Sequence, residues 1–460
     1  MNRILVATLI VCLGVTSPAA ARTLEDMLDE ADALYREARY YEALDVALDA
    51  VEWFSGSPDA HALMGRILFK IARFEEARER FDEALTIDPN HFWARYGLGL
   101  YYLARGNPEA AVDELGAARD LWPDNELPCL MLARANEEMD GWGEAYGWMG
   151  EAVGIIEARE GIAPASLELE MDRLDFLAGR DPYRVSAAFD RTTVPLEEDL
   201  PVVRVRLGVG VEGRFLLDTA AARGLVAHPA VVEGAAGEWI LTLEGRRREG
   251  RSRDELHLLP EISIGDLRMY DVPCLVTEHV FPGVDGIIGL PFMKRFVWIF
   301  DFGARQVTLL DPARDPAWAY RYSRGEVTSR MYTGGPLMIP VHLYEDRPAV
   351  VVLDSASSAA SLDHEFFERD VMGMIPLDRI RDLRYEENPH GAMALLVFDL
   401  PSVSVDDRVV LEDLSVKTFS LEDSRRWAGV AAPGLLGMSL FQDWIIDLDF
   451  SEGRMTLRKD

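Results

Sequence analysis

The sequence predicts two kinds of fold in one chain: an α-helical array, followed by an all-β domain made of two similar lobes. Two observations support this prediction. Residues 24–159 repeat small and apolar residues every 34 positions, with helical spacing between them. Residues 199–460 contain a second pattern twice, an apolar run that ends in Asp and continues into a hydroxyl residue and small residues. At 460 residues, the chain is also longer than one ordinary hydrophobic core allows.

The N-terminal segment, residues 1–21, has the pattern of a secretory signal. Arg3 supplies a positive charge, an apolar core follows, and Ser17 to Ala21 are the small residues typical of a cleavage zone. The apolar core is too short to span a bilayer as a helix. Cys12 comes too early for a lipoprotein site. We therefore expect a periplasmic or secreted protein with no membrane insertion once the signal is removed.

Composition and charge narrow the classes of partner. With 49% hydrophobic and 9% aromatic residues, the chain has the composition of a globular protein. A formal net charge of −32 argues against nucleic acid or an anionic membrane as a partner. Cys129 and Cys274 fall in different predicted domains, so we expect two buried free thiols, with a disulfide between them as the alternative.

Small residues define the period of the helical array. Phe74 and Phe81 are examples of the apolar residues between them, and Pro89 and Pro123 end two of the repeats. Small residues at fixed places let paired helices approach closely. Three series recur every 34 positions: Ala43, Ala77, Ala111 and Ala145; Ala50, Ala84, Ala118 and Ala152; and Ala31, Gly65, Gly99 and Ala133.

This pattern resembles four tetratricopeptide repeats over residues 23–159. The resemblance implies a concave face that binds a peptide or protein partner, and the alternative is that the array only serves as a scaffold. Residues 160–198 continue with a helix-like segment and break near Pro182, so we expect a helical linker there.

The β region contains one long pattern twice. Asp218 and Asp354 end the two apolar runs and lie 136 positions apart, and the strand patterns before them keep the same offset. Downstream, the Gly-x-x-Gly elements at 286–289 and 434–437 lie 148 positions apart, and this offset holds to the end of each copy. We therefore predict two lobes, residues 199–312 and 333–460. Residues 313–332 connect them, and Trp318, Tyr320 and Tyr322 are expected to pack against the lobes.

The duplicated pattern resembles a known enzyme family. A hydrophobic-hydrophobic-Asp-Thr/Ser element, followed later by a hydrophobic-hydrophobic-Gly element, is similar to one lobe of an aspartic protease. The closing stretches WIFDFGARQVTLL and WIIDLDFSEGRMTLR resemble the final strands of bacterial members of the retroviral-protease-like family. The resemblance covers residues 199–460. It implies a pepsin-like arrangement in which one chain supplies both aspartates, so that a monomer suffices.

The resemblance identifies the catalytic candidates as Asp218 and Asp354. Two carboxylates a hydrogen bond apart cannot both ionise readily, so they share a proton. One then acts as base toward water while the other donates to the carbonyl oxygen. The hydroxyls of Thr219 and Ser355 are implied to join the two turns. An isolated Asp-Thr or Asp-Ser is often only a turn or a helix cap, but the matched positions favour a catalytic pair.

The chain departs from the family pattern at one position of each turn. Ala220 and Ala356 stand where the family has glycine. Glycine allows sharp turns and close approach of a ligand backbone, so we expect each added methyl either to strain its turn or to narrow the substrate path. This departure supports an alternative function, a catalytically weak or inactive peptide-binding or scaffold protein of the cell envelope.

Residues 234–253 occupy the place of the family's flap. Glycines punctuate this segment, so it is either a hairpin that closes over substrate or a mobile surface loop. Its arginines favour acidic substrates, dock on the array, or are simply solvated; they are Arg246, Arg247, Arg248, Arg251 and Arg253.

Rival chemistries lack their motifs. There is no His-Glu-x-x-His, no Gly-x-Ser-x-Gly and no phosphate-binding loop, so we expect neither a metal nor an organic cofactor. The sequence thus predicts an exported aspartic endopeptidase that acts on a peptide or protein substrate, with the repeats recruiting that substrate or a partner.

Overall fold

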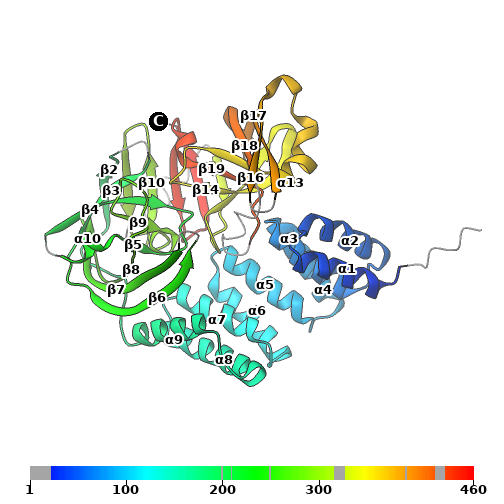
Figure 1. Cartoon of the computed structure of the whole chain (residues 1–460), viewed down its shortest axis with the longest axis horizontal. Coiled ribbons are helices and arrows are strands. Elements are labelled where there is room, and N and C mark those ends of the chain that lie inside the picture. The colour runs from blue at the N-terminus through cyan, green and yellow to red at the C-terminus, as the bar shows by residue number, and fades with distance from the viewer. Residues whose placement is uncertain are drawn as a thin grey trace, which may run out of the picture.

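The computed structural model describes residues 22–197, 200–208, 210–247, 250–314, 327–388, 391–419 and 430–459. In this part of the chain a helical array precedes a β-rich region of two lobes, as predicted (Figure 1). The predicted signal segment lies outside the described residues, as do Trp318, Tyr320 and Tyr322. Across the described ranges, every helix is too short or too polar to span a bilayer.

The helical array consists of antiparallel helix pairs, and equivalent helices of successive pairs start 34 residues apart. This confirms the period predicted from the small residues. The helices are α1 (Leu24–Arg36), α2 (Tyr40–Trp53), α3 (Pro58–Lys70), α4 (Phe74–Ile87), α5 (Phe92–Ala104), α6 (Pro108–Leu121), α7 (Glu126–Glu138) and α8 (Trp142–Glu160).

Two local features explain the repeat. The turn inside each pair contains one residue in the left-handed region, with φ between 59° and 68°, at Ala38, Ala72, Gly106 and Asp140. The predicted small residues lie where helices touch: a Cβ added at Gly65 would lie 2.6 Å from the Phe81 ring. Large side chains at these positions would force the helices apart.

The predicted helical linker, residues 160–198, is only partly helical. α9 (Ala165–Ala178) packs against α8 and against strand β6 of the first lobe. The chain then forms β1 (Arg184–Val185) and β2 (Arg191–Pro195), which pair with strands of the β region. These short strands are exposed at alternate positions and have little hydrophobic signal of their own, which is why the sequence does not reveal them.

The first lobe is a closed barrel of six strands in the order β8-β5-β9-β4-β3-β7, with β7 pairing back to β8 and β6 extending β7. Its elements are β3 (Val202–Leu207), β4 (Val211–Asp218), β5 (Leu225–Ala227), α10 (Pro229–Val232), β6 (Glu238–Arg247), β7 (Gly250–Ile264), β8 (Leu267–Val276), β9 (Gly286–Gly289) and α11 (Leu290–Met293).

The second lobe repeats this topology, with the closed order β18-β15-β19-β14-β13-β17 and β16 extending β17. Short helical turns, including α13 (His364–Phe366), separate β15 from β16 and account for extra length in this lobe. Its strands are β13 (Met338–Leu343), β14 (Arg347–Asp354), β15 (Ala360–Asp363), β16 (Ile380–Asn388), β17 (Gly391–Val405), β18 (Arg408–Phe419) and β19 (Gly434–Gly437).

A third sheet joins the lobes. Its central strands β10 and β20 pair antiparallel, with Trp298 opposite Leu448. Each lobe contributes two strands, and the edge strands β2 and β12 come from the two predicted connecting segments. The predicted connection, residues 313–332, is therefore not wholly a linker, because its β12 is an edge strand of this sheet. The strands are β10 (Val297–Asp301), β11 (Gln306–Leu310), β12 (Val327–Arg330), β20 (Ile445–Asp449) and β21 (Arg454–Arg458), together with β2.

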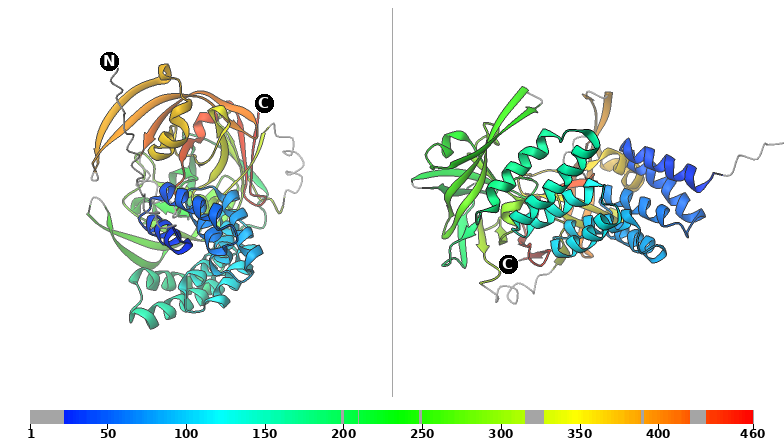
Figure 2. Two further views of the ribbon diagram at one scale, coloured as in Figure 1. Left: turned by 90° about the vertical axis from the view of Figure 1, so that its right-hand side faces the viewer. Right: turned by 90° about the horizontal axis from the view of Figure 1, so that it is seen from below.

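The array lies against both lobes, curving beneath them (Figures 1 and 2). One continuous hydrophobic core contains residues of the first three repeats and of both lobes. Arg369 of the second lobe pairs with Asp45 of α2, and Arg295 of the first lobe pairs with Asp140 beside α7.

Cys129 and Cys274 are buried free thiols, as predicted.

Candidate active site

Each candidate aspartate is the last residue of a barrel strand. Asp218 ends β4 and lies opposite Gly289 of β9 in a parallel pairing. Asp354 ends β14 and lies opposite Gly437 of β19, also in parallel. The two carboxylates therefore occupy the same place in the two barrels, which is the place that the sequence duplication predicts.

The Gly-x-x-Gly elements pack closely beside these turns because the last glycine of each element, Gly289 or Gly437, has no side chain. A Cβ added at Gly289 would overlap the carbonyl oxygen of Arg223, and one added at Gly437 would overlap the carbonyl oxygen of Ser357. Any larger residue would push β9 or β19 away from the Asp turn that it supports.

The hydroxyl residues that follow the aspartates join the two turns. The Thr219 amide donates to Ser355 Oγ at 2.9 Å, and the Ser355 amide donates to Thr219 Oγ1 at 3.0 Å. Each hydroxyl also donates across the interface, Thr219 to the Leu353 carbonyl at 2.6 Å and Ser355 to the Leu217 carbonyl at 2.7 Å. Both side chains are fully buried. These four bonds hold Asp218 and Asp354 on neighbouring turns.

The two carboxylates differ in their hydrogen bonds. Asp218 Oδ1 accepts from the amides of Ala220 at 2.8 Å and Ala221 at 3.1 Å. Asp354 Oδ1 accepts from the amide of Ala356 at 2.8 Å. Because amide donors stabilise the charged form of a carboxyl group, Asp218 is the easier of the two to ionise.

Burial and mutual repulsion disfavour two negative charges at the site. Burial raises the pKa of Asp218 above its ordinary value, although its amide bonds oppose the shift. Burial and the charge of Asp218 together raise the pKa of Asp354 to about 7. The pair therefore retains a proton well above the pH at which an isolated aspartate loses it.

The two alanines do not strain the turns. Ala220 and Ala356 both lie outside the left-handed region, so neither position requires glycine for its backbone conformation. The expectation of strain was wrong, because these turns bend without a positive φ at the residue in question. The expectation that the methyl groups narrow the substrate path stays a prediction.

The predicted flap is a hairpin in its backbone. β6 and β7 pair antiparallel, from Glu238 opposite Leu258 to Arg247 opposite Gly250. Helix α9 packs against β6. The second lobe has a matching hairpin of β16 and β17. The tip, with Arg248, and the side chains of Arg246, Arg247, Arg251 and Arg253 lie outside the described residues.

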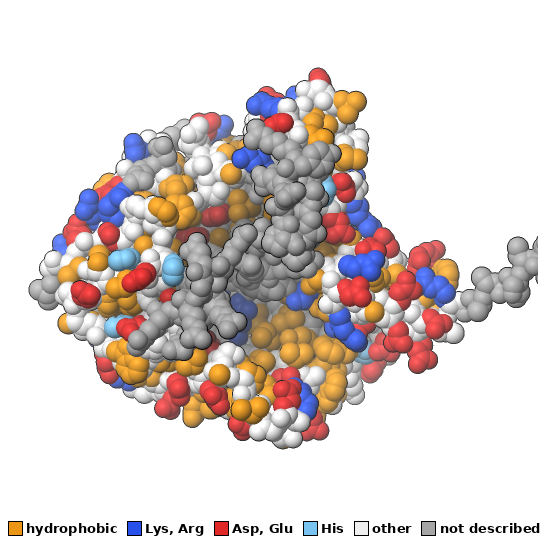
Figure 3. Space-filling model, in the orientation of Figure 1, with side chains coloured by type: hydrophobic (Ala, Val, Ile, Leu, Met, Phe, Trp, Pro, Cys, Tyr) orange, Lys and Arg blue, Asp and Glu red, His pale blue; other side chains and the backbone are white. Residues whose placement is uncertain are grey.

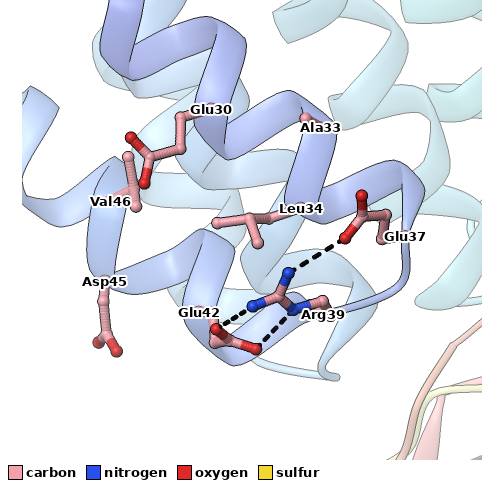
Figure 4. Close-up of a pocket in the computed structure, with 8 residues that line it drawn as sticks. All are labelled: Glu30, Ala33, Leu34, Glu37, Arg39, Glu42, Asp45 and Val46. Atoms are coloured by element: carbon pink, nitrogen blue, oxygen red, sulfur yellow. Dashed lines mark hydrogen bonds and ion pairs between the residues drawn. The ribbon is translucent and has the colours of Figure 1, made fainter.

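A surface pocket of about 520 Å³ lies elsewhere, between α1 and α2 (Figure 4). Acidic side chains dominate its lining, and Arg39 pairs with Glu37 and Glu42 at its rim. It belongs to the first repeat, contains neither candidate aspartate, and has no part in the chemistry considered for them.

One residue at the site was missed by the sequence analysis. The Leu337 amide donates to the Thr219 carbonyl at 2.9 Å, and the Leu337 carbonyl accepts from the Leu353 amide at 2.9 Å. Leu337 thus touches both catalytic turns through its backbone. The only signal for it was its place 136 positions after Pro201, whose carbonyl accepts from Leu217 in the same way.

Comparison with protein families agrees with this architecture. A tetratricopeptide repeat model matches residues 28–91 and 62–126, and an aspartyl protease model matches residues 203–292, within the first lobe. The chain therefore contains tetratricopeptide repeats and an aspartyl protease domain. A search of curated proteins finds no match.

Three solved structures are similar to about a third of the chain, at low overall similarity. A thermophilic tetratricopeptide repeat protein of Thermus thermophilus is 18% identical over 34% of this chain and 84% of its own, with a TM-score of 0.30. Pseudomonas aeruginosa PilF is 18% identical over 33% and 68%, with a TM-score of 0.31. MamA of Desulfovibrio magneticus is 19% identical over 33% and 84%, with a TM-score of 0.29.

Proposed function

We propose that this chain, which joins tetratricopeptide repeats to an aspartyl protease domain, is an exported aspartic endopeptidase with Asp218 and Asp354 as its catalytic pair. The observation that carries the proposal is the set of four buried hydrogen bonds between Thr219 and Ser355 and the opposite strands. Such a junction brings the ends of two barrel strands together, and both of those strands end in Asp. A purely structural turn needs no second carboxylate beside it.

The hydrogen bonds of the pair support a division of roles before attack. Asp218, with two amide donors, is the ionised partner and accepts a proton from water. Asp354, with the higher pKa, keeps its proton and donates it to the carbonyl oxygen of the scissile peptide bond. The water oxygen then bonds to the carbonyl carbon and gives a tetrahedral diol.

Breakdown of this diol returns the pair to its starting state. The proton now on Asp218 moves to the peptide nitrogen, the carbon–nitrogen bond breaks, and an amine leaves. One hydroxyl of the diol returns its proton to Asp354 as the carboxylic acid product forms. Because protons move within a coupled pair, the roles describe one microstate and the pair titrates as a unit.

The surface beside the lobes supports recruitment of an extended polypeptide. Hydrophobic side chains gather over α5, at the edge of a hollow between the array and the lobes (Figure 3). On α5 itself, Trp93, Tyr96 and Leu100 are partly buried apolar and aromatic residues. An apolar, aromatic surface beside the lobes suits unfolded or extended segments of a protein substrate.

Export rests on the signal-like residues 1–21. Thr23 caps α1 in a reciprocal capping box with Asp26, so the folded array begins directly after the expected cleavage zone. This arrangement fits a mature protein that starts near residue 22, in the periplasm or outside the cell.

The direct test is cleavage of a diverse peptide library by purified residues 22–460, at acid and neutral pH. Asp218→Asn and Asp354→Asn should each abolish cleavage, while Asp124→Asn, at an exposed turn of the array, should leave it unchanged. Mass spectrometry of the products identifies the bonds cleaved. Equal activity in all three variants would refute the proposed pair.

The second candidate function is peptide binding without hydrolysis. It is favoured by Ala220 and Ala356, whose methyl groups stand where the aspartic protease pattern has glycine. Binding of library peptides by the wild-type chain, without any product, would support this function over the first.

A further inference from the structure

Residues 331–337 form a strap that reaches from the helical array to the catalytic turns. The strap follows β12 and leads into β13. One side of it bonds to α4, α5 and α7 of the array, and its last residue bonds to both Asp turns. An interaction with the array alone, or with the site alone, would be ordinary packing; the strap has both.

On the array side, Glu75 of α4 is the main anchor. Its Oε1 accepts from the Tyr332 hydroxyl at 2.9 Å and from Tyr101 at 3.1 Å, and it pairs with Arg330 at 2.7 Å. Burial opposes ionisation of Glu75, but the bonds from Tyr332 and Arg330 outweigh it and lower its pKa. The Tyr332 ring also packs on Phe74, with ring centroids 4.5 Å apart. Tyr332 itself is buried.

Backbone contacts extend this anchor. The Thr333 amide donates to the Ala104 carbonyl at 2.6 Å, and Arg105 donates to the Met331 carbonyl at 2.6 Å. Arg134 of α7 donates to the Gly334 carbonyl. A Cβ added at Gly334 would lie 2.7 Å from the Ala104 Cα, so the two backbones are in direct contact.

On the site side, the strap ends at Leu337, which is fully buried. Its amide bonds to Thr219, the residue after Asp218, and its carbonyl bonds to Leu353, the residue before Asp354. Pro201 holds the equivalent position in the first lobe but has no amide hydrogen. The hydrogen bond to the turn of the opposite lobe is therefore made by Leu337 only, at the end of the strap that the array contacts.

The strap is short and closed on itself. Tyr332 and Met338 exchange two backbone hydrogen bonds of 2.9 Å, so the residues between them form a tight loop. A displacement of Tyr332 is thus carried directly to Met338 and to its neighbour Leu337. Close-packed protein interiors transmit such shifts because they have few voids to absorb them.

We propose that the helical array positions the two catalytic turns through this strap, with Glu75 as the positioning residue that fixes it. The inference rests on the proposed function for its meaning in catalysis, but the coupling between Glu75 and the Asp turns does not require turnover. The array is then part of the active site's framework, in addition to any substrate that it recruits.

The test uses the full mature chain with Glu75→Ala and Tyr332→Phe. The matched control is Glu76→Ala, because Glu76 is adjacent and pairs with the exposed Arg73. The substrate is a short peptide that the wild-type chain cleaves in the library assay. Because a misplacement of about 1 Å can cost about 10²-fold in rate, we expect Glu75→Ala to lower kcat by up to about 10²-fold with little change in KM. Glu75→Gln, whose amide oxygen still accepts from both tyrosines, should restore part of the loss.

A second readout separates this inference from the proposed function. Carbon-13 NMR of labelled aspartate, assigned with Asp354→Asn, follows the titration of Asp354 in the absence of substrate. Glu75→Ala and Tyr332→Phe should each shift its midpoint, and Glu76→Ala should not. Tyr332→Phe removes one hydroxyl only, so it covers the case in which Glu75→Ala fails to fold.

The outcomes are distinct. If the wild-type chain cleaves nothing but the Asp354 midpoint moves in the Glu75 and Tyr332 variants, the proposed function fails and the positioning role stands. If kcat, the pH profile and the Asp354 midpoint are all unchanged in these variants, the strap is simple interdomain packing and the inference is overturned.

Discussion

Thr219 and Ser355 exchange hydrogen bonds across the two lobes: each backbone amide donates to the other residue's hydroxyl, at 2.9 and 3.0 Å. Both hydroxyls are fully buried and donate onward to a carbonyl of the opposite strand. Since water cannot replace these partners, the junction is a fixed distance constraint between the residues that carry Asp218 and Asp354.

The first prediction removes one of these hydroxyls. Thr219→Val keeps the shape of the side chain but leaves the Ser355 amide and the Leu353 carbonyl without this partner. An unsatisfied buried group costs about 1–3 kcal/mol, so the free energy of unfolding should fall by at least that much. Thr328→Val, the same change at an exposed strand position, is the control. Urea unfolding measures both, and equal stability of the two variants would contradict the constraint.

The second prediction is a bell-shaped dependence of hydrolysis on pH. The active pair holds one proton, on Asp354, so kcat/KM should fall at low pH as Asp218 is protonated too and no carboxylate is left to act as the base. It should fall again as pH rises through about 7, where Asp354 loses its proton. Initial rates on one cleaved peptide across this range measure the profile. Activity that keeps rising above neutral pH would indicate a different acid or base.

The third prediction concerns stability. Between the pKa of an unfolded aspartate, 3.8, and the folded value of about 7, folded Asp354 keeps a proton that the unfolded chain has lost. The contribution of Asp354 to the free energy of unfolding therefore falls as pH rises across this interval. Asp354→Asn removes this effect.

Its size is bounded by the pKa difference. At 1.36 kcal/mol for each pH unit, Asp354→Asn should be more stable than wild type by at most about 4 kcal/mol above pH 7, with little difference near pH 4. Denaturant unfolding at both pH values measures this, with Asp124→Asn as the control for loss of an exposed charge. A stability advantage that is largest in acid would have the wrong sign.

The sequence was most informative where structure repeats. The alanine and glycine series predicted the helix pairs, because each small residue lies at a contact that recurs in every repeat. The offset of 136 shared by the two aspartates and by the strand patterns before them likewise predicted two similar lobes, which are two barrels with matching strand order in the structure. The short strands β1, β2 and β12 carry too few buried residues to be recognised by periodicity, so they were assigned to linkers.

The docking of the array on the lobes could not be predicted. Glu75 and Tyr332 are 257 residues apart, and neither departs from the local pattern of its own segment. Leu337 acts through its backbone, which leaves no mark on residue type. Such contacts depend on how the folded array and the folded lobes fit together, and no periodic pattern in the local sequence predicts that fit.

The fourth prediction restores glycine to the Asp turns. Because Ala220 and Ala356 are not in the left-handed region, Ala220→Gly with Ala356→Gly relieves no backbone strain. The double variant should lose up to about 1 kcal/mol of stability at each site, since glycine widens the unfolded ensemble. Hydrolysis should rise, because the change removes the two methyl groups that are expected to narrow the substrate path. An unchanged kcat/KM would show that the methyl groups do not crowd the substrate.

The last prediction is that the array and the lobes unfold together. The core that contains Phe74 and Phe81 of the array continues into both lobes, and the Lys70 carbonyl accepts from the Ala431 amide at 2.7 Å. Separating the units would expose Tyr332 and leave Glu75 without partners from the lobes. Calorimetry of the mature chain should therefore give one transition whose calorimetric and van't Hoff enthalpies agree. A fragment that begins at residue 184 should not fold alone, because its apolar contacts with the first three repeats would face water. Two separate transitions, or a folded fragment, would show that each unit is stable by itself, and the strap would then join two independent domains.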